Sequence, residues 1–204
     1  MTARPGFARK LLESLRADAA DCTACLLWRD ATQTVFGEGE PESLIVLVGE
    51  QPGDAEDRAG RPFVGPAGRL LDRALEAAGI DRTLVYVTNA VKHFKWTPRG
   101  KRRIHKTPAQ REIEACSRWL EGELAALHPT LVVCLGATAA RAILGPQARV
   151  GALRGRIIER ADAPPALVTV HPSYVLRVRE GDQAAEYDAF VDDLRVARKF
   201  APAE

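Results

Sequence analysis

Several polar residues that could carry out chemistry stand directly after short apolar runs of this chain. Glu50 and Gln51 follow a run of branched residues that breaks at Gly49, Asn89 follows a second run, and His171 follows a third. Short apolar runs bounded by turn residues are typical of buried strands in a parallel sheet. Ligands of open α/β sheets bind just beyond the carboxyl ends of such strands. The sequence therefore predicts that these side chains converge on one cleft.

Each of these residues also has a purely structural interpretation. Asn89 could stabilise a turn, Ser173 could cap a helix, and His171 could be a hydrogen-bonded loop histidine. Glu50 could belong to an acidic surface loop, because three more carboxylates follow within seven residues. Convergence of several such groups from separate segments is what favours a functional site over these alternatives.

An aromatic residue stands in a loop that is too polar to belong to the core. Phe63 lies in the sequence GRPFVGPAG, where Gly60, Gly65 and Gly68 allow close approach of backbone or ligand. We expect Phe63 to stack on a planar ligand, a use of aromatic rings that is common in nucleic-acid binding. The alternative is a loop anchor that packs on the helix below.

The cysteine pattern indicates a metal centre. Cys22 and Cys25 are separated by two residues, a spacing suited to one metal site, and disulfides are not expected in a cytoplasmic chain. The candidates for two further ligands are His93, Cys116 and Cys134, although a Cys inside an apolar strand is usually a small hydrophobe. The residues alone leave open a zinc site with three Cys and one His, an iron–sulfur cluster with one His ligand, or no metal.

Positive charge is concentrated in one segment, although the net charge of the chain is only +2. Residues 92–106 contain seven Lys and Arg and no Asp or Glu, which is the kind of patch that attracts phosphate backbones. His105 lies in this segment, and a histidine in a basic run is by itself most simply part of a loop that steers DNA.

Strands and helices alternate along the chain, which predicts one α/β domain over residues 1–204 with helices on both faces of a mainly parallel sheet. The apolar runs give four strands, at 44–48, 84–88, 131–135 and 167–170. Amphipathic patterns, proline and glycine predict helices at 9–20, 66–78, 108–127, 137–144 and 184–199. Residues 54–65 are expected to form a loop, and residues 145–164 a loop or an edge hairpin.

Composition excludes several classes of protein. A hydrophobic content of 46% over 204 residues is that of a globular domain, and no apolar run approaches the ~20 residues of a membrane span. The N-terminal segment has no apolar signal region, so a cytoplasmic protein is expected. The sequence shows no heptads and no long apolar edge, so a monomer is expected. A phosphate loop at Gly49–Gly53 is disfavoured, because carboxylates stand where phosphate requires positive charge or free N–H groups.

These motifs, taken together, resemble those of the uracil-DNA glycosylase superfamily, and specifically its iron–sulfur family 4. Two residues and one insertion depart from the usual pattern of that family: Gln51 stands where Ala is usual, His93 stands where Cys is usual, and GKRRIHK is inserted at 100–106. These departures resemble the UdgX subgroup, whose members attach covalently to uracil-containing DNA through a loop histidine. The matching segments are Cys22-x-x-Cys25, GEQPGDAED at 49–57, GRPFVGPAGRLL at 60–71, VTNAVKH at 87–93, Cys116 and HPS at 171–173.

The resemblance implies a three-layer α/β/α fold, a [4Fe-4S] cluster and a role for each matched residue. It implies that Cys22, Cys25, His93 and Cys116 are the cluster ligands and that Cys134 is a bystander. It implies that Phe63 stacks on uracil, that Asn89 reads its Watson–Crick edge, and that His171 stabilises the departing base. Glu50 and Gln51 are implied to face the deoxyribose, and His105 to become bonded to DNA. The further residues expected to contact uracil or DNA are Gly49, Asp54, Asp57, Lys101, Arg102, Arg103, Ser173 and Arg177.

The implied reaction begins with cleavage of a glycosidic bond in uracil-containing DNA, single strands included, and releases uracil. The sugar passes through a cation-like transition state, and the nucleotide must be unstacked or flipped to reach the site. A neutral His105, favoured by the surrounding Lys and Arg residues, would then attack the sugar in place of water. Two alternatives remain at this point: a turnover uracil-DNA glycosylase that releases an abasic site, and a catalytically silent iron–sulfur protein that binds uracil-containing DNA.

Overall fold

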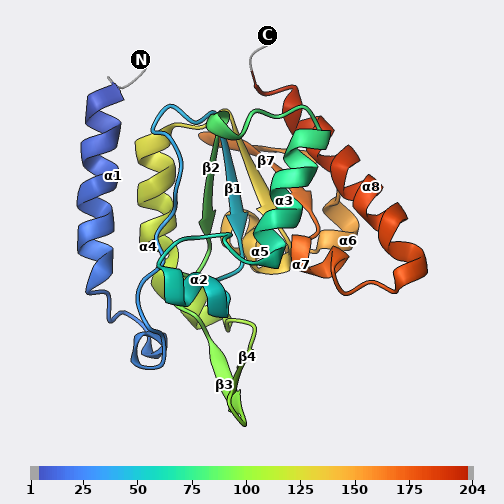
Figure 1. The fold of residues 1–204 in the computed structure, drawn as a ribbon. Helices are drawn as coiled ribbons and strands as arrows, with labels where there is room; N and C mark the ends of the chain where they lie inside the picture. Colours follow the sequence, from blue (N-terminus) through green and yellow to red (C-terminus); the bar gives the residue numbers. More distant parts are fainter. Residues whose placement is uncertain (1–4, 202–204) are drawn as a thin grey trace.

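The structure is a computed structural model that describes residues 5–201, and its centre is a five-stranded sheet (Figure 1). The strand order is β2-β1-β5-β7-β6, in which all neighbours are parallel except the antiparallel pair β6 and β7. This confirms the predicted α/β class with a mainly parallel sheet. The strands are β1 (Ile45–Gly49), β2 (Val85–Asn89), β5 (Leu131–Leu135), β6 (Ile157–Arg160) and β7 (Ala163–Thr169).

The prediction of four strands was wrong by one, because β6 adds an antiparallel edge. Its residues are at most half-buried and its pairing with β7 contains an irregularity between Ile158 and Arg160. Such a strand has no fully apolar run to mark it, whereas the four predicted strands are buried for most or all of their length. The interpretation of residues 145–164 as an edge hairpin is confirmed for the part that forms β6.

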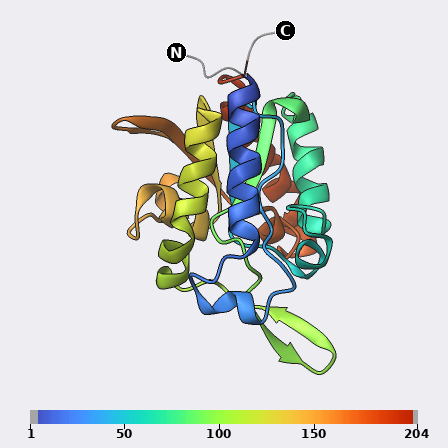
Figure 2. The same cartoon turned by 90° about the vertical axis from the view of Figure 1, so that its left-hand side faces the viewer.

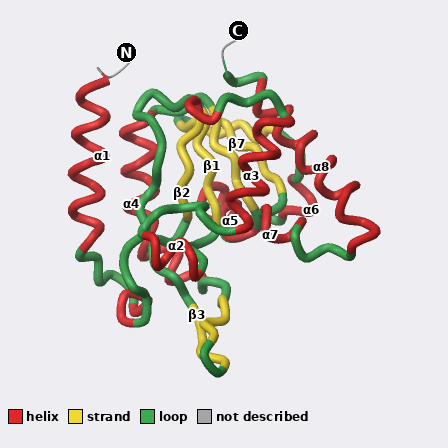
Figure 3. The backbone as a smooth tube through the Cα atoms, in the orientation of Figure 1, coloured by secondary structure: helices red, strands yellow, loops and turns green. Residues whose placement is uncertain are grey.

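Helices cover both faces of the sheet (Figures 1 and 3). Helices α1, α4 and α5 pack on one face, and α3 and α8 on the other. Two short 3₁₀ helices, at Leu26–Arg29 and Arg82–Leu84, lie in the connections. The α-helices are α1 (Pro5–Ala20), α2 (Asp54–Ala59), α3 (Pro66–Ala77), α4 (Gln110–Leu127), α5 (Ala137–Leu144), α6 (Val150–Leu153), α7 (Pro172–Val175) and α8 (Glu180–Arg198).

Strand β1, which lies between β2 and β5, divides its side chains between two apolar cores. Val46 and Val48 pack with α1, α4 and α5, whereas Ile45 and Leu47 pack with α3 and α8. Successive side chains of a strand point to opposite faces, so a strand covered by helices on both faces is apolar throughout. All five residues of β1 are buried, which fixes the position of the residues that follow it.

The basic segment forms a β-hairpin that projects from the body of the molecule (Figures 1 and 2). Strands β3 (Trp96–Arg99) and β4 (Arg102–His105) pair antiparallel, and Gly100 adopts a left-handed φ of 59° in the turn between them. The prediction of an irregular loop was wrong here. A projecting hairpin buries little, so its sequence lacks the apolar alternation that marks a strand.

The prediction of a loop over residues 54–65 was also wrong at its beginning, where α2 forms. The Glu56 carboxylate accepts the backbone N–H of Gly53 at 3.2 Å and that of Gly65 at 2.8 Å. A side chain that reaches back to the first N–H groups of its own helix stabilises the helix start. Two of the acidic residues in this segment, Glu56 and Asp57, are buried. Within the described part of the chain, no helix is long and apolar enough to cross a membrane.

Candidate functional site

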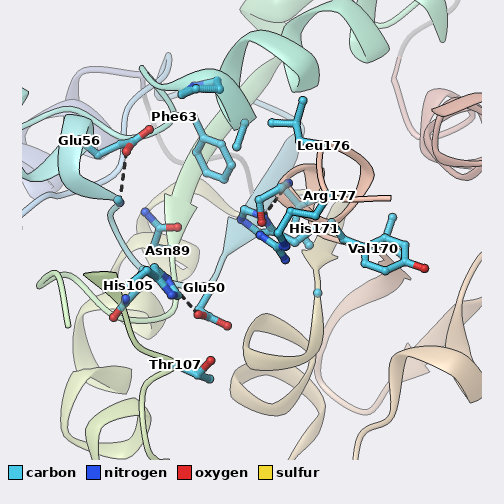
Figure 4. A pocket seen from close by; sticks show the side chains of 18 of the residues that line it. Glu50, Glu56, Phe63, Asn89, His105, Thr107, Val170, His171, Leu176 and Arg177 are labelled. Atoms are coloured by element: carbon cyan, nitrogen blue, oxygen red, sulfur yellow. Dashed lines mark hydrogen bonds and ion pairs between the residues drawn. The ribbon is translucent and has the colours of Figure 1, made fainter. Parts of the chain in front are cut away.

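A cleft of about 1100 Å³ opens at the carboxyl ends of the parallel strands (Figure 4). Glu50 follows β1, Asn89 ends β2 and His171 stands two residues after β7, so the predicted convergence of these side chains is confirmed. His105 enters the same cleft from the hairpin. Other lining residues are Gln51, Asp54, Glu56, Phe63, Thr107, Gly136, Ser173, Tyr174, Leu176 and Arg177.

The inner part of the cleft is built around Gly49, Asn89 and Phe63. A Cβ atom at Gly49 would overlap Asn89 Oδ1 and lie 2.7 Å from Phe63 Cζ, so glycine is needed for both side chains to approach this backbone. Phe63 has a left-handed φ of 55°, and Gly68 in α3 lies so close that a Cβ there would overlap the Phe63 backbone. The stacked rings of Phe63 and His171 have centroids 6.1 Å apart. A strained aromatic held at a site wall is typical of a binding residue.

Hydrogen bonds define the tautomer of His171. Its Nδ1 atom accepts the backbone N–H of Ser173 at 3.1 Å and lies 2.8 Å from the Ser173 hydroxyl oxygen. Because Nδ1 accepts, the neutral ring carries its proton on Nε2. Burial lowers the pKa of His171 to about 4, against the opposing attraction of Glu50. His171 is therefore a neutral N–H donor at physiological pH.

Glu50 and His105 form a contact pair. Glu50 Oε1 lies 3.2 Å from His105 Nε2, and Glu50 Oε2 accepts a hydrogen bond from the Thr138 hydroxyl at 2.6 Å. Burial opposes ionisation of Glu50, but the hydrogen bonds from His105 and Thr138 outweigh it and lower its pKa. Glu50 is therefore a carboxylate that faces the cleft. Cationic neighbours were expected around His105, and its ring also has this anionic partner.

Gln51, which was predicted to face the deoxyribose, lines the cleft and also holds the base of the hairpin. It is buried; its Oε1 accepts the N–H of Lys95 at 3.0 Å, and its Nε2 donates to the carbonyls of Lys95 and Lys106, each at 3.1 Å. Lys95 and Lys106 flank the two hairpin strands directly. The amide therefore fixes the strand that carries His105.

Asp54, Asp57 and Arg103, which were predicted to contact DNA, form a cluster of ion pairs, and Asp54 also lines the cleft. The Arg103 guanidinium forms ion pairs with both carboxylates, at 2.6 Å to Asp57, and the Asp57 carboxylate also accepts from Thr32. Asp57 is fully buried, so in this structure it holds the hairpin against α2 and cannot reach DNA. Spacing along the chain does not show such a pairing, because about 46 residues separate the partners.

Of the remaining basic residues of the hairpin, Arg99 and Arg102 form a cross-strand pair next to the turn that contains Lys101. Trp96 lies opposite His105 and Arg99 lies opposite Arg102 in the antiparallel register. Because alternate residues point to opposite faces, Arg102 lies on the face opposite His105. Lys101 and Arg102 are exposed, so both remain available to phosphates.

Thr138, Tyr174 and Leu176 contribute to the site although sequence reasoning missed them. Tyr174 and Leu176 are exposed apolar residues that line the cleft beside Ser173 and Arg177, both of which were predicted. The sequence feature that could have indicated them is the apolar run at 174–176, directly after the HPS motif at 171–173. Thr138 gave no signal, because it is one small polar residue in an Ala-rich helix.

A buried ion pair lies beneath Asn89. Lys92 Nζ contacts Glu123 Oε2 at 2.5 Å, and both side chains are fully buried. Lys92 also donates to the Thr88 hydroxyl at 2.6 Å and to the Asn89 carbonyl at 3.0 Å, while Glu123 accepts from Tyr86. A buried ion pair persists only when its partners satisfy one another. The network therefore ties the end of β2 to α4.

The candidate metal ligands come from three segments of one region. Cys22 and Cys25 pack against the core that contains Cys116, and burial together with the two neighbouring thiols raises the pKa of Cys116 to about 11. Two sulfur atoms accept hydrogen bonds at 3.2 Å: Cys116 from the Lys92 N–H and Cys22 from the Trp119 indole. The donors are thus soft sulfur ligands with N–H partners, a chemistry that fits an iron–sulfur cluster.

The geometry of these side chains is not a closed ligand shell. His93 Nε2 lies 2.9 Å from the Thr34 hydroxyl. Across residues 5–201, no three His, Cys, Asp or Glu side chains gather closely enough to hold a metal ion. The four cysteines are free thiols, and Cys134 is enclosed in strand β5.

The fold and the cleft define an α/β protein whose site lies at the carboxyl ends of parallel strands and presents a carboxylate, an amide and two histidines. Comparison with protein families identifies the group more closely. The model of the uracil DNA glycosylase superfamily matches residues 36–195, and the chain belongs to that family.

Individual relatives agree with this assignment. The chain is 36% identical to a type-4 uracil-DNA glycosylase of Thermotoga maritima over 96% of this chain and 97% of the relative. It is 36% identical to a type-4 uracil-DNA glycosylase of Pyrobaculum aerophilum over 81% of this chain and 85% of the relative. A type-5 uracil-DNA glycosylase of Thermus thermophilus is 38% identical over 54% of this chain and 53% of the relative.

Proposed function

We propose that this protein excises uracil from DNA and then bonds to the resulting deoxyribose through His105, in the manner of the UdgX subgroup. The observation that carries the proposal is the contact between His105 and Glu50, in the same cleft as Asn89 and His171. The glycosylase activity rests on the family and on the names of the relatives. The covalent step rests on the geometry of His105 and on the sequence departures at Gln51, at His93 and in the insertion.

Uracil recognition is assigned to Asn89, Phe63 and His171. An amide at Asn89 accepts from uracil N3–H and donates to O4, whereas the amino group of cytosine presents the opposite pattern. Phe63 supplies a face for stacking. The His171 Nε2–H donates to an oxygen of the departing base, and a donor placed where negative charge develops typically contributes about 3 kcal/mol.

The proposed chemistry has two steps. The bond between C1′ and uracil N1 breaks, and its electron pair leaves with uracil, while the Glu50 carboxylate stabilises the positive charge that develops on the sugar. A ring nitrogen of neutral His105 then donates its lone pair to C1′ and forms the new bond. The proton that the imidazole carried is lost to solvent, and the uracil anion takes one up, so the net change is transfer of one proton from histidine to uracil.

Glu50 and the hairpin supply the positioning that this attack requires. A carboxylate that contacts an imidazole orients the ring, as an acidic residue does in other nucleophile–base arrangements. Gln51 and the ion pairs of Arg103 hold the strand that carries His105, so the ring lies against Glu50 before DNA arrives. Positioning of a nucleophile is a large part of its reactivity. Lys101 and Arg102 are assigned to DNA phosphates.

The test is a denaturing gel of the protein mixed with a labelled oligonucleotide that carries one uracil. Wild type is expected to give a slower band that survives heat and detergent. His105→Ala is expected to lose the band, and His128→Ala, a substitution at the end of α4, is expected to keep it. If wild type leaves an alkali-labile site without a stable band, the protein is a turnover glycosylase. If wild type gives neither a stable band nor an alkali-labile site, the protein is a catalytically silent binder.

We further propose that Cys22, Cys25, His93 and Cys116 hold a [4Fe-4S] cluster. The group would contribute structural cross-linking, because it joins the segment after α1, the segment after β2 and helix α4. Support comes from the donor chemistry and the N–H partners of two of the sulfur atoms. His93 could bind the cluster through Nδ1 while its Nε2 keeps the contact with the Thr34 hydroxyl.

The cluster assignment is tested by iron and sulfide analysis of protein purified without oxygen. Cys116→Ser is expected to lower the iron content and the melting temperature. Cys134→Ser is the matched control, because Cys134 is equally buried but lies in strand β5, and its iron content is expected to equal that of wild type. Equal iron loss in both variants would contradict the assignment.

A further inference from the structure

We infer that Thr138 is the positioning residue that directs the Glu50 carboxylate toward His105, and that it thereby favours covalent capture over hydrolysis. The inference rests on the proposed function and assigns a role to a residue that sequence reasoning had not singled out. Thr138 lies in the first turn of α5, which begins directly after β5.

The fold brings Thr138 to Glu50 across two neighbouring strands. β1 and β5 pair in parallel, so their carboxyl ends lie at the same edge of the sheet. The chain leaves β5 through Gly136, whose φ is 91° and whose Cβ would lie 3.1 Å from the Cβ of His171. Glycine permits both the turn and this close approach, and α5 then starts beside Glu50.

The two carboxylate oxygens of Glu50 have different partners. The Thr138 hydroxyl donates to Oε2 at 2.6 Å, and His105 Nε2 lies 3.2 Å from Oε1. Thr138 is 1% exposed, so water cannot easily replace its hydroxyl. With one oxygen held by a buried donor, rotation of the carboxylate is restricted, and the other oxygen stays directed at the histidine.

The surroundings of Thr138 strengthen this arrangement. The Arg141 guanidinium, one turn further along α5, donates to the Thr138 oxygen at 3.4 Å, and a hydroxyl that accepts from a cation is a better donor. The charged and titratable groups that face Glu50 are His105 from β4 and His171 after β7, with Arg141 acting through Thr138.

The consequence concerns the fate of the sugar cation. A fixed Glu50 keeps the imidazole over the cleft, whereas a carboxylate that can rotate is also able to bind and orient water, the competing nucleophile. The two products, a covalent adduct and a free abasic site, arise from the same excision step. Thr138 therefore acts on the ratio of these products more than on the rate of uracil release.

The matched variants are Thr138→Val, which keeps the shape and removes the hydroxyl, and Thr138→Ser, which keeps the hydroxyl. The measured quantities are released uracil and covalent adduct in single-turnover reactions, followed from pH 4 to 8. Thr138→Val is expected to lower the ratio of adduct to uracil by roughly 10-fold, as expected for loss of one hydrogen bond to a charged group. Thr138→Ser is expected to restore the ratio.

The pH profile provides a readout that a loss of stability does not move. Removal of the Thr138 hydrogen bond raises the pKa of Glu50. The acidic limb of the pH–rate profile, where the rate falls as Glu50 is protonated, is therefore expected to shift to higher pH in Thr138→Val and to stay in place in Thr138→Ser. An unchanged ratio together with an unchanged limb in Thr138→Val overturns the inference. If wild type releases uracil without any adduct, the proposed function fails, and the position of the acidic limb still decides whether Thr138 controls Glu50.

Discussion

At the scale of single residues, the protonation state of His171 links its proposed role in uracil excision to the stability of the fold. Burial lowers the pKa of His171 from its ordinary value of 6.5 to about 4, and Nδ1 accepts the backbone N–H of Ser173. A protonated ring would carry a hydrogen on Nδ1 and would have to give up that contact. The neutral N–H donor that we propose for uracil excision is therefore also the form that the folded protein prefers.

This linkage predicts how stability depends on pH. Between pH 6.5 and 4 the unfolded chain binds a proton at His171 that the folded chain does not, so the contribution is complete above pH 6.5 and is lost toward pH 4. The stability advantage of wild type over His171→Gln is expected to shrink by about 1–3 kcal/mol over this range. Urea unfolding at several pH values measures it.

The control for that series is His128→Asn, because His128 adopts the left-handed conformation that asparagine tolerates. Its pH dependence is expected to match wild type. A constant difference between wild type and His171→Gln from pH 4 to 7 would show that His171 titrates normally in the folded protein.

At the scale of elements, the hairpin β3–β4 is a separate unit that a few polar contacts attach to the body. Gln51 contributes three hydrogen bonds at its base, and Arg103 contributes ion pairs to Asp54 and Asp57. The hairpin has almost no apolar core of its own, and an isolated two-stranded hairpin is marginally stable. Its position, and with it that of His105, therefore depends on these contacts.

We predict that Gln51→Leu loosens the hairpin without unfolding the protein. Loss of three hydrogen bonds, each contributing about 1 kcal/mol, is expected to speed amide exchange in Trp96–His105 by roughly 10- to 100-fold. Hydrogen exchange followed by mass spectrometry measures this. Gln33→Leu is the matched control, because it removes two side-chain hydrogen bonds to α2 and none to the hairpin; equal acceleration in both variants would contradict the assignment.

Elements that are buried on both faces could be predicted from the sequence, and elements held by polar contacts could not. Leu131–Leu135 is an unbroken apolar run, and the predicted boundaries of this strand are those of the structure. The hairpin and α2 are rich in charged residues, and the ion pairs that join them link residues far apart in the chain. The pairing of Arg103 with Asp57 and the contacts of Gln51 with the hairpin depend on the tertiary structure, so neither the residue types nor the family resemblance indicated them.

At the scale of the whole molecule, the buried pair of Lys92 and Glu123 joins the sheet to α4 directly below Asn89, the residue that we propose reads uracil. Lys92→Met leaves the Glu123 carboxylate buried without its cation, which is expected to cost about 3–5 kcal/mol. The double variant Lys92→Met with Glu123→Leu is expected to recover most of this loss, because an apolar pair fills the same space. Urea unfolding of the three variants, with Glu123→Leu alone included, tests the coupling; simple addition of the two losses would contradict it.

The topology of the sheet explains why the convergence of the residues at the strand ends could be predicted. Parallel pairing places Gly49 opposite Asn89 and Leu135 opposite Thr169, so the segments that follow all emerge at one edge of the sheet. Topology thus assembles Glu50, Asn89 and His171 from distant segments. His105 required the resemblance to a known family, since its strand belongs to a different sheet.

The measurement that tests the central claim most directly is the mass of the product formed from protein and a uracil-containing oligonucleotide under denaturing conditions. The account predicts one species whose mass is the sum of protein and DNA less one uracil, and peptide mapping that places the deoxyribose on His105. Separate masses of unmodified protein and abasic DNA, or an adduct on any other residue, would contradict it.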